Sequence, residues 1–391
     1  MAAGRVLILH NEVAADAGPA DRDVLVQRDA VRRALTANGW DTDCLACGLN
    51  LQDTADRLKA LQPDVVFNLV ESLDGTDRLM SVVPLLLDAL QVPYTGANTQ
   101  AMLSASGKIS TKQILRAHGL PTPDWWTTEA FVTDRPGNQW RKLPACGSSQ
   151  SQTEGLVKNC CDGDFRGRPD DVGPEETTGF SGIGPGRPLT VIMKPVWEHA
   201  SLNMDDNCVV AVQSPDEILR ALRQSEQNFG RPYFAEAYID GREFNLSLIQ
   251  DDSGTMRVLP PAEIDFCGFP PDKPRIVGHR AKWQETSFEY EQTPRRFEFP
   301  LTDTGLLREL KQLTQQCRQA FDLTGYARVD FRIDADGCPW ILEVNVNPCL
   351  SPDAGFAAAL QTAGIDFDDA MHWLVQAAVC GHSATRVSTE V

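Results

Sequence analysis

The stretch RVDFRIDADGCPWILEVNVNP, residues 328–348, contains the clearest signals of both the fold and the functional site. Apolar and polar residues alternate over Arg328–Ile333, as they do in strands that have one buried face, and a second short strand is expected over Trp340–Val344. The turn residues of Asp334–Gly337 lie between these two segments. We therefore expect an antiparallel hairpin.

Polar side chains of this hairpin are expected to meet on one face, because side chains alternate along a strand. Arg328, Asp330 and Arg332 share a face of the first strand, and Glu343 and Asn345 share a face of the second. Carboxylate and amide oxygens are the ligands that Mg²⁺ prefers, usually together with substrate phosphates. Asp330, Glu343 and Asn345 are therefore candidate ligands of Mg²⁺ or Mn²⁺, and Arg328 is a candidate cation for developing negative charge. The alternative is a merely solubilising face, which the matching parity of two acids, an amide and an arginine disfavours.

Three lysines are candidates for binding phosphates beside such a metal site. Lys194 is the strongest of them, because the apolar strand VIM runs directly into it. Lys108 lies between two expected helices, and Lys282 lies in the segment RAKW. Each lysine taken singly is more often a solvated surface residue. Metal and several cations around a triphosphate are how phosphoryl transfer is stabilised.

Composition limits the classes of partner. The chain has 391 residues, with 36 Lys and Arg against 54 Asp and Glu, and a formal net charge of −18. This balance argues against a protein that mainly binds nucleic acid or an anionic membrane, since both need a positive face. We find no apolar run long enough for a transmembrane helix and no secretory signal. The eleven cysteines are then read as reduced thiols, and a cytoplasmic location is expected.

The first hundred residues alternate strand and helix signals. Strands are expected at Val6–His10, around Leu45, at Asp64–Val70 and at Val92–Tyr94, with helices between them. This alternation is typical of an α/β, doubly wound parallel-sheet domain. No glycine-rich nucleotide loop follows the first strand, where His10–Gly18 reads HNEVAADAG.

The remainder of the chain reads as α+β. The stretch 134–188 is rich in Gly, Pro, Ser and charge, and we expect a long irregular insertion there. Pro232–Asp240 and Glu243–Gln250 flank Gly241 and are expected to pair as strands. Leu306–Phe321 carries an apolar stripe at helical spacing and is expected to form an amphipathic helix.

These residues and the surrounding motifs resemble those of the ATP-grasp superfamily. Within it, the chain resembles a divergent member of the D-alanine–D-alanine ligase-like family. The resemblance covers nearly the whole chain apart from residues 134–188. The motifs that carry it are DVVFNLVES (64–72), VPYTGAN (92–98), GKISTKQILRAHGLPTP (107–123), VIMKPVWEHAS (191–201), FAEAYIDGREFNLSLI (234–249), RAKW (280–283), ARVDFRID (327–334) and ILEVNVNP (341–348).

The resemblance implies an N-terminal Rossmann-like domain (1–97) followed by a two-subdomain ATP-grasp fold. Its central subdomain would span 98–236, including the insertion, and its C-terminal subdomain 237–391 would carry the metal site. ATP would lie between two antiparallel sheets.

The resemblance also assigns roles to residues. Arg328 and Lys282 match catalytic positions, the first as the transition-state arginine and the second as the phosphate-contacting lysine of a mobile loop. Asp330, Glu343 and Asn345 match the metal ligands. The positions that match ATP contacts are Lys108 and Lys194 for phosphate, Ser201 in the phosphate-covering loop, Glu236 and Tyr238 near adenine, and Glu243 at the ribose.

The substrate side departs from the dedicated D-alanine ligases. Their substrate-binding glutamate has no motif counterpart here, although Glu12 or Asp16 can substitute for it. The phosphate loop lacks one serine and both glycines at 198–203, Trp283 replaces a tyrosine, and Cys349 replaces a glycine after the metal-binding asparagine.

We therefore expect an ATP-dependent carboxylate–amine ligase that forms an amide or peptide bond through an acyl phosphate. Its substrates would be a small acid and an amine, with amino acids the expected class, and they need not be two D-alanines. By resemblance alone a homodimer is expected. The alternatives are a non-catalytic regulator that binds Mg-ATP, and an ATP-grasp enzyme that acts on an unrelated acid.

Overall fold

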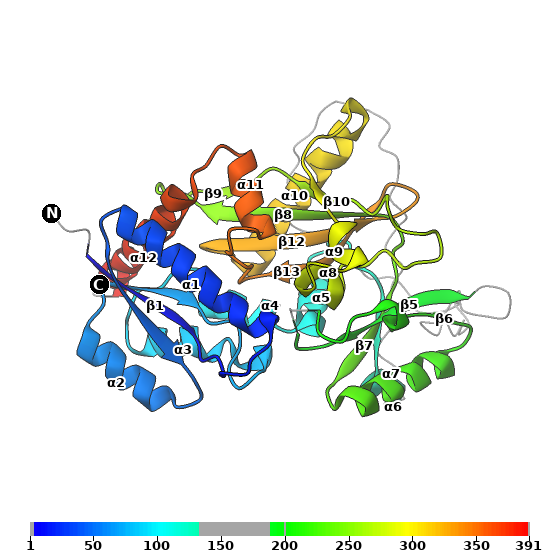
Figure 1. Ribbon diagram of the computed structural model, residues 1–391, viewed down its shortest axis with the longest axis horizontal. Coiled ribbons are helices and arrows are strands. Elements are labelled where there is room, and N and C mark those ends of the chain that lie inside the picture. The colour runs from blue at the N-terminus through cyan, green and yellow to red at the C-terminus, as the bar shows by residue number, and fades with distance from the viewer. Residues whose placement is uncertain (1–3, 133–187, 199–200, 390–391) are drawn as a thin grey trace, which may run out of the picture.

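The computed structural model describes residues 4–132, 188–198 and 201–389. The expected insertion at 134–188 lies outside these residues, except for Pro188. Within the described residues no helix is long and apolar enough to cross a membrane. Three sheets organise the described chain (Figure 1).

The first sheet is parallel and has the order β2-β1-β3. Its strands are β1 (Arg5–Asn11), β2 (Asp41–Cys47) and β3 (Val65–Leu69), and the helices around it are α1 (Pro19–Ala37), α2 (Leu51–Leu61), the 3-10 turn η1 (Asp77–Leu79) and α3 (Val82–Ala89). Val6 and Ile8 pack with α1 on one face, while Leu7 and Leu9 pack with α2 and α3 on the other. The doubly wound domain is confirmed.

The second sheet is antiparallel, with the order β4-β7-β5-β6. Its elements are β4 (Trp125–Thr127), α6 (Thr128–Val132), β5 (Leu189–Pro195), the 3-10 turn η2 (Asp206–Cys208), β6 (Val209–Val212), α7 (Pro215–Phe229) and β7 (Tyr233–Ala237). Ile218 and Leu222 of α7 are fully buried against this sheet.

The third sheet is also antiparallel and has the order β11-β10-β8-β12-β13, with β9 on β8. Its elements are β8 (Arg242–Gln250), β9 (Met256–Val258), β10 (Ala262–Ile264), α8 (His279–Trp283), α9 (Phe288–Glu291), β11 (Arg295–Arg296), the 3-10 turn η3 (Leu301–Asp303), α10 (Thr304–Phe321), β12 (Tyr326–Ile333) and β13 (Pro339–Asn345). The amphipathic helix predicted at Leu306–Phe321 is confirmed, and it buries its stripe against one face of this sheet.

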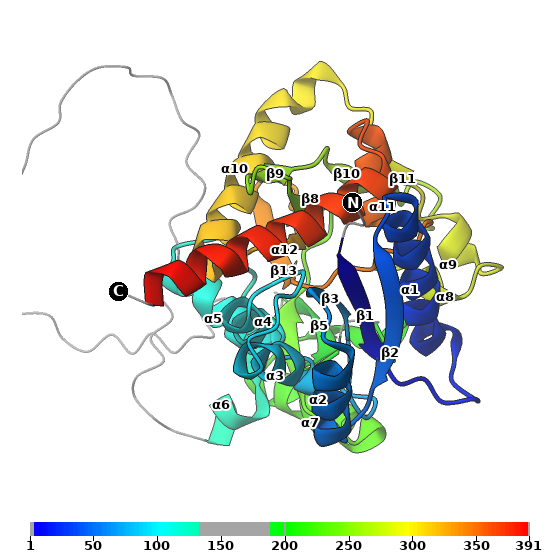
Figure 2. The same cartoon turned by 90° about the vertical axis from the view of Figure 1, so that its left-hand side faces the viewer.

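Four further helices join the sheets. They are α4 (Thr99–Ala105), α5 (Lys108–Ala117), α11 (Gly355–Thr362) and α12 (Phe367–Thr389). The helices α4 and α5 pack on α10, while α12 packs on α1, β3 and β8 and so connects the first sheet with the third (Figure 2).

Two strand predictions are wrong in detail. The strands on either side of Gly241 do not pair with each other, because β7 belongs to the second sheet and β8 to the third. The chain therefore crosses between the two antiparallel sheets at Gly241. The fourth strand expected at Val92–Tyr94 is a single parallel bridge between Val66 and Tyr94.

Candidate functional site

The predicted hairpin forms, and its polar residues share one face. In the register of β12 with β13, Asp330 lies opposite Glu343 and Arg328 lies opposite Asn345. The apolar residues between them are buried on the other face, which α10 covers. The alternation read from the sequence therefore brings two carboxylates, an amide and a guanidinium together on the open face of the third sheet.

A bidentate ion pair joins two of these residues. Arg328 donates from Nε to Asp330 Oδ1 at 2.7 Å and from Nη2 to Oδ2 at 2.8 Å. Burial by itself lowers the pKa of Arg328, but the Asp330 carboxylate outweighs burial and raises it, so the guanidinium stays charged. Asn245 on β8 donates to Asp330 Oδ1 at 2.8 Å. Sequence reasoning missed Asn245, although it lies two residues after Glu243 and so on the same face of its strand.

The donor set suits a hard divalent cation that also binds phosphate. Among the described residues no group of three His, Cys, Asp or Glu side chains is close enough to hold a metal by itself. The candidate ligands are instead two carboxylates and the amide of Asn345, whose Oδ1 also accepts a hydrogen bond from the Asn347 backbone N at 3.0 Å. Mg²⁺ usually takes one or two carboxylates and leaves its other positions to phosphates and water. The residues therefore fit magnesium with a bound nucleotide.

Lys108 begins α5 and reaches the hairpin. Its Nζ lies 3.9 Å from Glu343 Oε1 and donates to the backbone carbonyl of Glu198. The preceding Gly107 allows this approach, because a Cβ there would lie 2.7 Å from the Trp197 ring. Lys108 therefore links the third sheet with the segment that follows β5.

One turn along α5, the fully buried Lys112 forms part of a charge cluster that the sequence analysis missed. Lys112 Nζ lies 2.5 Å from Glu236 Oε2, and Lys194 Nζ lies 2.6 Å from Glu236 Oε1. Burial alone would raise the pKa of Glu236, but the two ammonium groups hold it below its ordinary value. The expected adenine-side residue Glu236 thus has its carboxylate between two lysines. Lys112 lies four residues after Lys108 on the same helix, and this spacing could have indicated that both lysines face the site.

Two further expected ATP contacts, Tyr238 and Glu243, lie on either side of the crossing between the sheets. Arg332 pairs with Glu243 at 2.8 Å, and its guanidinium lies 6.0 Å from the Tyr238 ring centroid. Burial raises the pKa of Glu243, and Arg332 opposes that shift. Tyr238 Oη accepts a hydrogen bond from the Arg275 backbone N at 2.9 Å. Arg332 shares a strand face with Arg328 and Asp330, yet it was not assigned to the site.

The segment 273–291 brings Lys282 toward the hairpin. Burial lowers the pKa of Lys282, while the nearby carboxylates of Glu343 and Asp330 raise it and Arg328 lowers it. Its ammonium therefore lies within electrostatic range of the candidate metal ligands. Ser201, the expected phosphate-loop serine, donates to the Val277 backbone carbonyl at 3.2 Å and so contacts the same segment.

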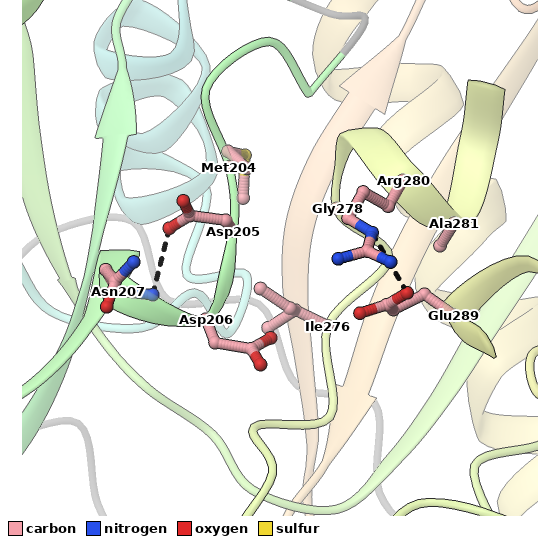
Figure 3. A pocket seen from close by; sticks show the side chains of 9 residues that line it. All are labelled: Met204, Asp205, Asp206, Asn207, Ile276, Gly278, Arg280, Ala281 and Glu289. Atoms are coloured by element: carbon pink, nitrogen blue, oxygen red, sulfur yellow. Dashed lines mark hydrogen bonds and ion pairs between the residues drawn. The ribbon is translucent and has the colours of Figure 1, made fainter. Parts of the chain in front are cut away.

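A cavity lies where the second sheet faces this segment (Figure 3). Its wall includes Asp206 from one side and Arg280 and Glu289 from the other. Lys273 bridges the two sides, 2.5 Å from Asp206 and 3.0 Å from Glu289, and Arg280 lies 3.2 Å from Glu289. We call these four residues the latch. It fastens the segment that carries Lys282 to the second sheet.

The loop after β13 contacts the N-terminal domain. Cys349 Sγ and Ser351 Oγ both donate to the carboxylate of Asp23 on α1, at 3.0 and 2.7 Å. Burial raises the pKa of Cys349 well above its ordinary value, so the thiol keeps its proton and acts as a donor. The acid that contacts this loop is thus Asp23, whereas Glu12 and Asp16 were the acids suggested by the sequence.

Comparisons with known proteins agree with this geometry. A family model described as the D-ala D-ala ligase C-terminus matches residues 188–376. A D-alanine–D-alanine ligase of Chromohalobacter salexigens is 28% identical, over 93% of this chain and 91% of its own length. One from Pseudomonas fluorescens is 25% identical, over 96% of this chain and 92% of its own length.

Solved structures of the same class share the fold. The D-alanine–D-alanine ligase of Bacillus anthracis, in complex with ATP, aligns with a TM-score of 0.63 at 19% identity, covering 98% of this chain and 100% of that one. The enzyme from Coxiella burnetii aligns with a TM-score of 0.61 at 14% identity, covering 99% of this chain and 98% of the other.

Proposed function

The chain belongs to the D-alanine–D-alanine ligase-like family of ATP-grasp ligases, and on that premise we propose that it joins a carboxylate to an amine through an acyl phosphate. The observation that carries this proposal is the shared face of Arg328, Asp330, Glu343 and Asn345 on β12 and β13. The substrate carboxylate attacks the γ-phosphate of ATP, and ADP leaves. The amine then attacks the acyl carbon, and phosphate leaves.

Residues of this chain supply binding and charge stabilisation. Lys108, Lys194 and Lys282 are proposed to bind the nucleotide phosphates, and Asp330, Glu343 and Asn345 to hold Mg²⁺. Magnesium, when bound, neutralises phosphate charge and orients its oxygens. Arg328 is proposed to stabilise the negative charge of the acyl phosphate and of the tetrahedral intermediate.

The remaining ATP contacts are proposed as the resemblance assigns them: Ser201 in the phosphate-covering loop, Glu236 and Tyr238 at the adenine, and Glu243 at the ribose. The latch holds the segment 273–291 against the second sheet, and this supports a role for the segment in covering the site. Such a cover would exclude water and so protect an acyl phosphate from hydrolysis.

Two residues near the loop after β13, Arg295 and Asp23, support a substrate that carries both charges of an amino acid. Arg295 Nη1 donates to the Asp353 backbone carbonyl at 3.0 Å, and no carboxylate in the described part of the chain lies within ion-pair distance of it. The Arg295 side chain is exposed, and both partial desolvation and the nearby charge of Arg328 lower its pKa. A substrate carboxylate would relieve the repulsion between the two guanidiniums. Asp23, which contacts the loop after β13 through Cys349 and Ser351, is proposed as the acid that binds the substrate ammonium group.

We propose amino acids as the substrate class and do not restrict them to D-alanine, since the residues around Cys349 and at 198–203 depart from the dedicated enzymes. A second copy of the chain is proposed as its partner by resemblance alone. No role for nucleic acid is proposed.

The test is phosphate release from Mg-ATP against a grid of D- and L-amino acids and small carboxylic acids, offered singly and in pairs. The blank is the double variant Asp330→Asn with Glu343→Gln, and Asp336→Asn in the exposed hairpin turn is the matched control. Phosphate that appears only with a particular pair, with the amide seen by mass spectrometry, supports ligation. Release with an acid alone indicates phosphoryl transfer. ATP binding without release across the grid favours the non-catalytic regulator.

A further inference from the structure

Two lysines and one glutamate share an interior position that ordinarily disfavours charge. The exposed fractions of Lys112, Glu236 and Lys194 are 0%, 1% and 9%. Burying an ionised group is costly unless it is paired and hydrogen-bonded. Glu236 lies between the two ammonium groups, at 2.5 and 2.6 Å, so each of its carboxylate oxygens is paired with a positive charge.

Hydrogen bonds through Thr122 connect the cluster with the third sheet. Lys112 also donates to Thr122 Oγ1 at 2.9 Å, and Thr122 Oγ1 donates to the Ile341 backbone carbonyl at 2.8 Å. Ile341 lies on β13, two residues before Glu343. A continuous hydrogen-bonded path therefore runs from Lys194 on β5, through α5, to the strand that carries a candidate metal ligand.

The charge of the cluster depends on Lys112. Glu236 beside Lys194 alone would cancel the charge of that lysine. With Lys112 present, the three groups together carry one positive charge. Lys194 is the member that lies closest to solvent, with a side chain that is 11% exposed.

We propose that Lys112 is a positioning residue that neutralises and orients Glu236, so that Lys194 is held in place with its charge available to the nucleotide. Lys112 does not touch the nucleotide in this proposal; it acts through Glu236. The inference rests on the proposed function, because it takes Lys194 as a phosphate-binding residue.

Burial makes the charge of this cluster sensitive to pH. Burial lowers the pKa of Lys112 to about 8, and Glu236 opposes that shift. Loss of the Lys112 proton leaves Glu236 to neutralise Lys194, so ATP affinity should fall as the pH rises through about 8. The groups that face the ammonium are Glu236 on β7, Lys194 on β5, Thr122 before β4, Arg116 on α5 and the Trp125 ring, whose centroid lies 5.7 Å away.

The experiment measures binding of a fluorescent ATP analogue with Mg²⁺ and does not require turnover. Lys112→Met should weaken binding about tenfold, since it leaves Glu236 opposing Lys194. The double variant Lys112→Met with Glu236→Gln should recover most of that loss, because Lys194 is then unopposed. Lys59→Met, at an exposed lysine of α2, is the matched control and should bind as the wild type does.

A merely structural role for Lys112 predicts a different pattern. The double variant would then bind no better than Lys112→Met, and this result would overturn the proposal. The fall in affinity near pH 8 should also disappear in the double variant, and its persistence there would contradict the proposal. If Lys112→Met does not fold, the double variant is compared with the wild type instead, and a tenfold loss of affinity in the double variant would overturn the proposal. A wild-type protein that binds no nucleotide would instead contradict the proposed function.

Discussion

Arg328 and Asp330, two residues apart on β12, form a bidentate ion pair with contacts of 2.7 and 2.8 Å. One guanidinium thus fixes the orientation of a candidate metal ligand and lies on the face where substrate charge would develop. The two functions need the planar fork of arginine, which an ammonium group does not reproduce.

Arg328→Lys should therefore lower kcat more than it raises KM for ATP. We expect kcat to fall about 100-fold, the scale measured when a single oxyanion donor is lost. ADP formation at saturating ATP measures the effect. Arg257→Lys, at a half-exposed ion pair on β9, is the control and should change neither constant. A rise of about 100-fold in KM for ATP with kcat unchanged would instead indicate that Arg328 only binds the nucleotide.

Much of this site was predictable because it rests on strand parity. The sequence of β12 and β13 places Arg328, Asp330, Glu343 and Asn345 on one face without reference to the rest of the fold. The amphipathic stripe of α10 was equally local. The roles of the individual residues came from the resemblance and stay predictions.

Contacts between distant segments were not predictable in the same way. Lys112 and Glu236 are separated by more than a hundred residues, and no periodicity indicates that they meet. The expected pairing of the strands around Gly241 failed for a related reason. A glycine between two strand segments is typical of a hairpin, but here the chain leaves one sheet and enters another.

The latch should control how tightly the segment 273–291 closes over the site. Lys273→Ala removes the contacts to Asp206 and Glu289, which lie at 2.5 and 3.0 Å. Partly exposed ion pairs contribute little each, so we expect KM for ATP to rise about three- to tenfold with kcat nearly unchanged.

The latch prediction is checked by steady-state kinetics at low and high salt. High salt should raise the wild-type KM toward that of the variant, because it screens the same contacts. Lys311→Ala, at an exposed position of α10, is the control. A variant whose KM equals that of the wild type at low salt would show that the latch does not hold the segment.

Stability should depend on pH through Lys112. Its pKa in the folded protein is about 8, below the ordinary 10.5. The unfolded chain then binds more protons than the folded one between these values, so this group makes the free energy of unfolding rise with pH across that window, by up to about 3 kcal/mol.

Urea denaturation at about pH 7 and about pH 10 checks this, with wild type and Lys112→Met compared at each pH. The wild type should gain stability relative to the variant at the higher pH. A difference that stays constant, or that shrinks as the pH rises, would mean that Lys112 does not titrate in this window.

Gly241 should tolerate no side chain, because it lies where the chain crosses between the second and third sheets. A Cβ there would lie 1.9 Å from the Ile333 carbonyl oxygen, and the Gly241 carbonyl accepts a hydrogen bond from Arg332 Nη1 at 3.0 Å. Gly241→Ala must displace backbone, and we expect a loss of about 2 kcal/mol or more in the free energy of unfolding. The displaced Arg332 should also weaken ATP binding through Glu243.

Gly305→Ala in α10, where a Cβ meets no atom within 4 Å, is the matched control and should be neutral or stabilising by about 0.5–1 kcal/mol. Equal stability of the two variants would mean that the crossing is not constrained at Gly241.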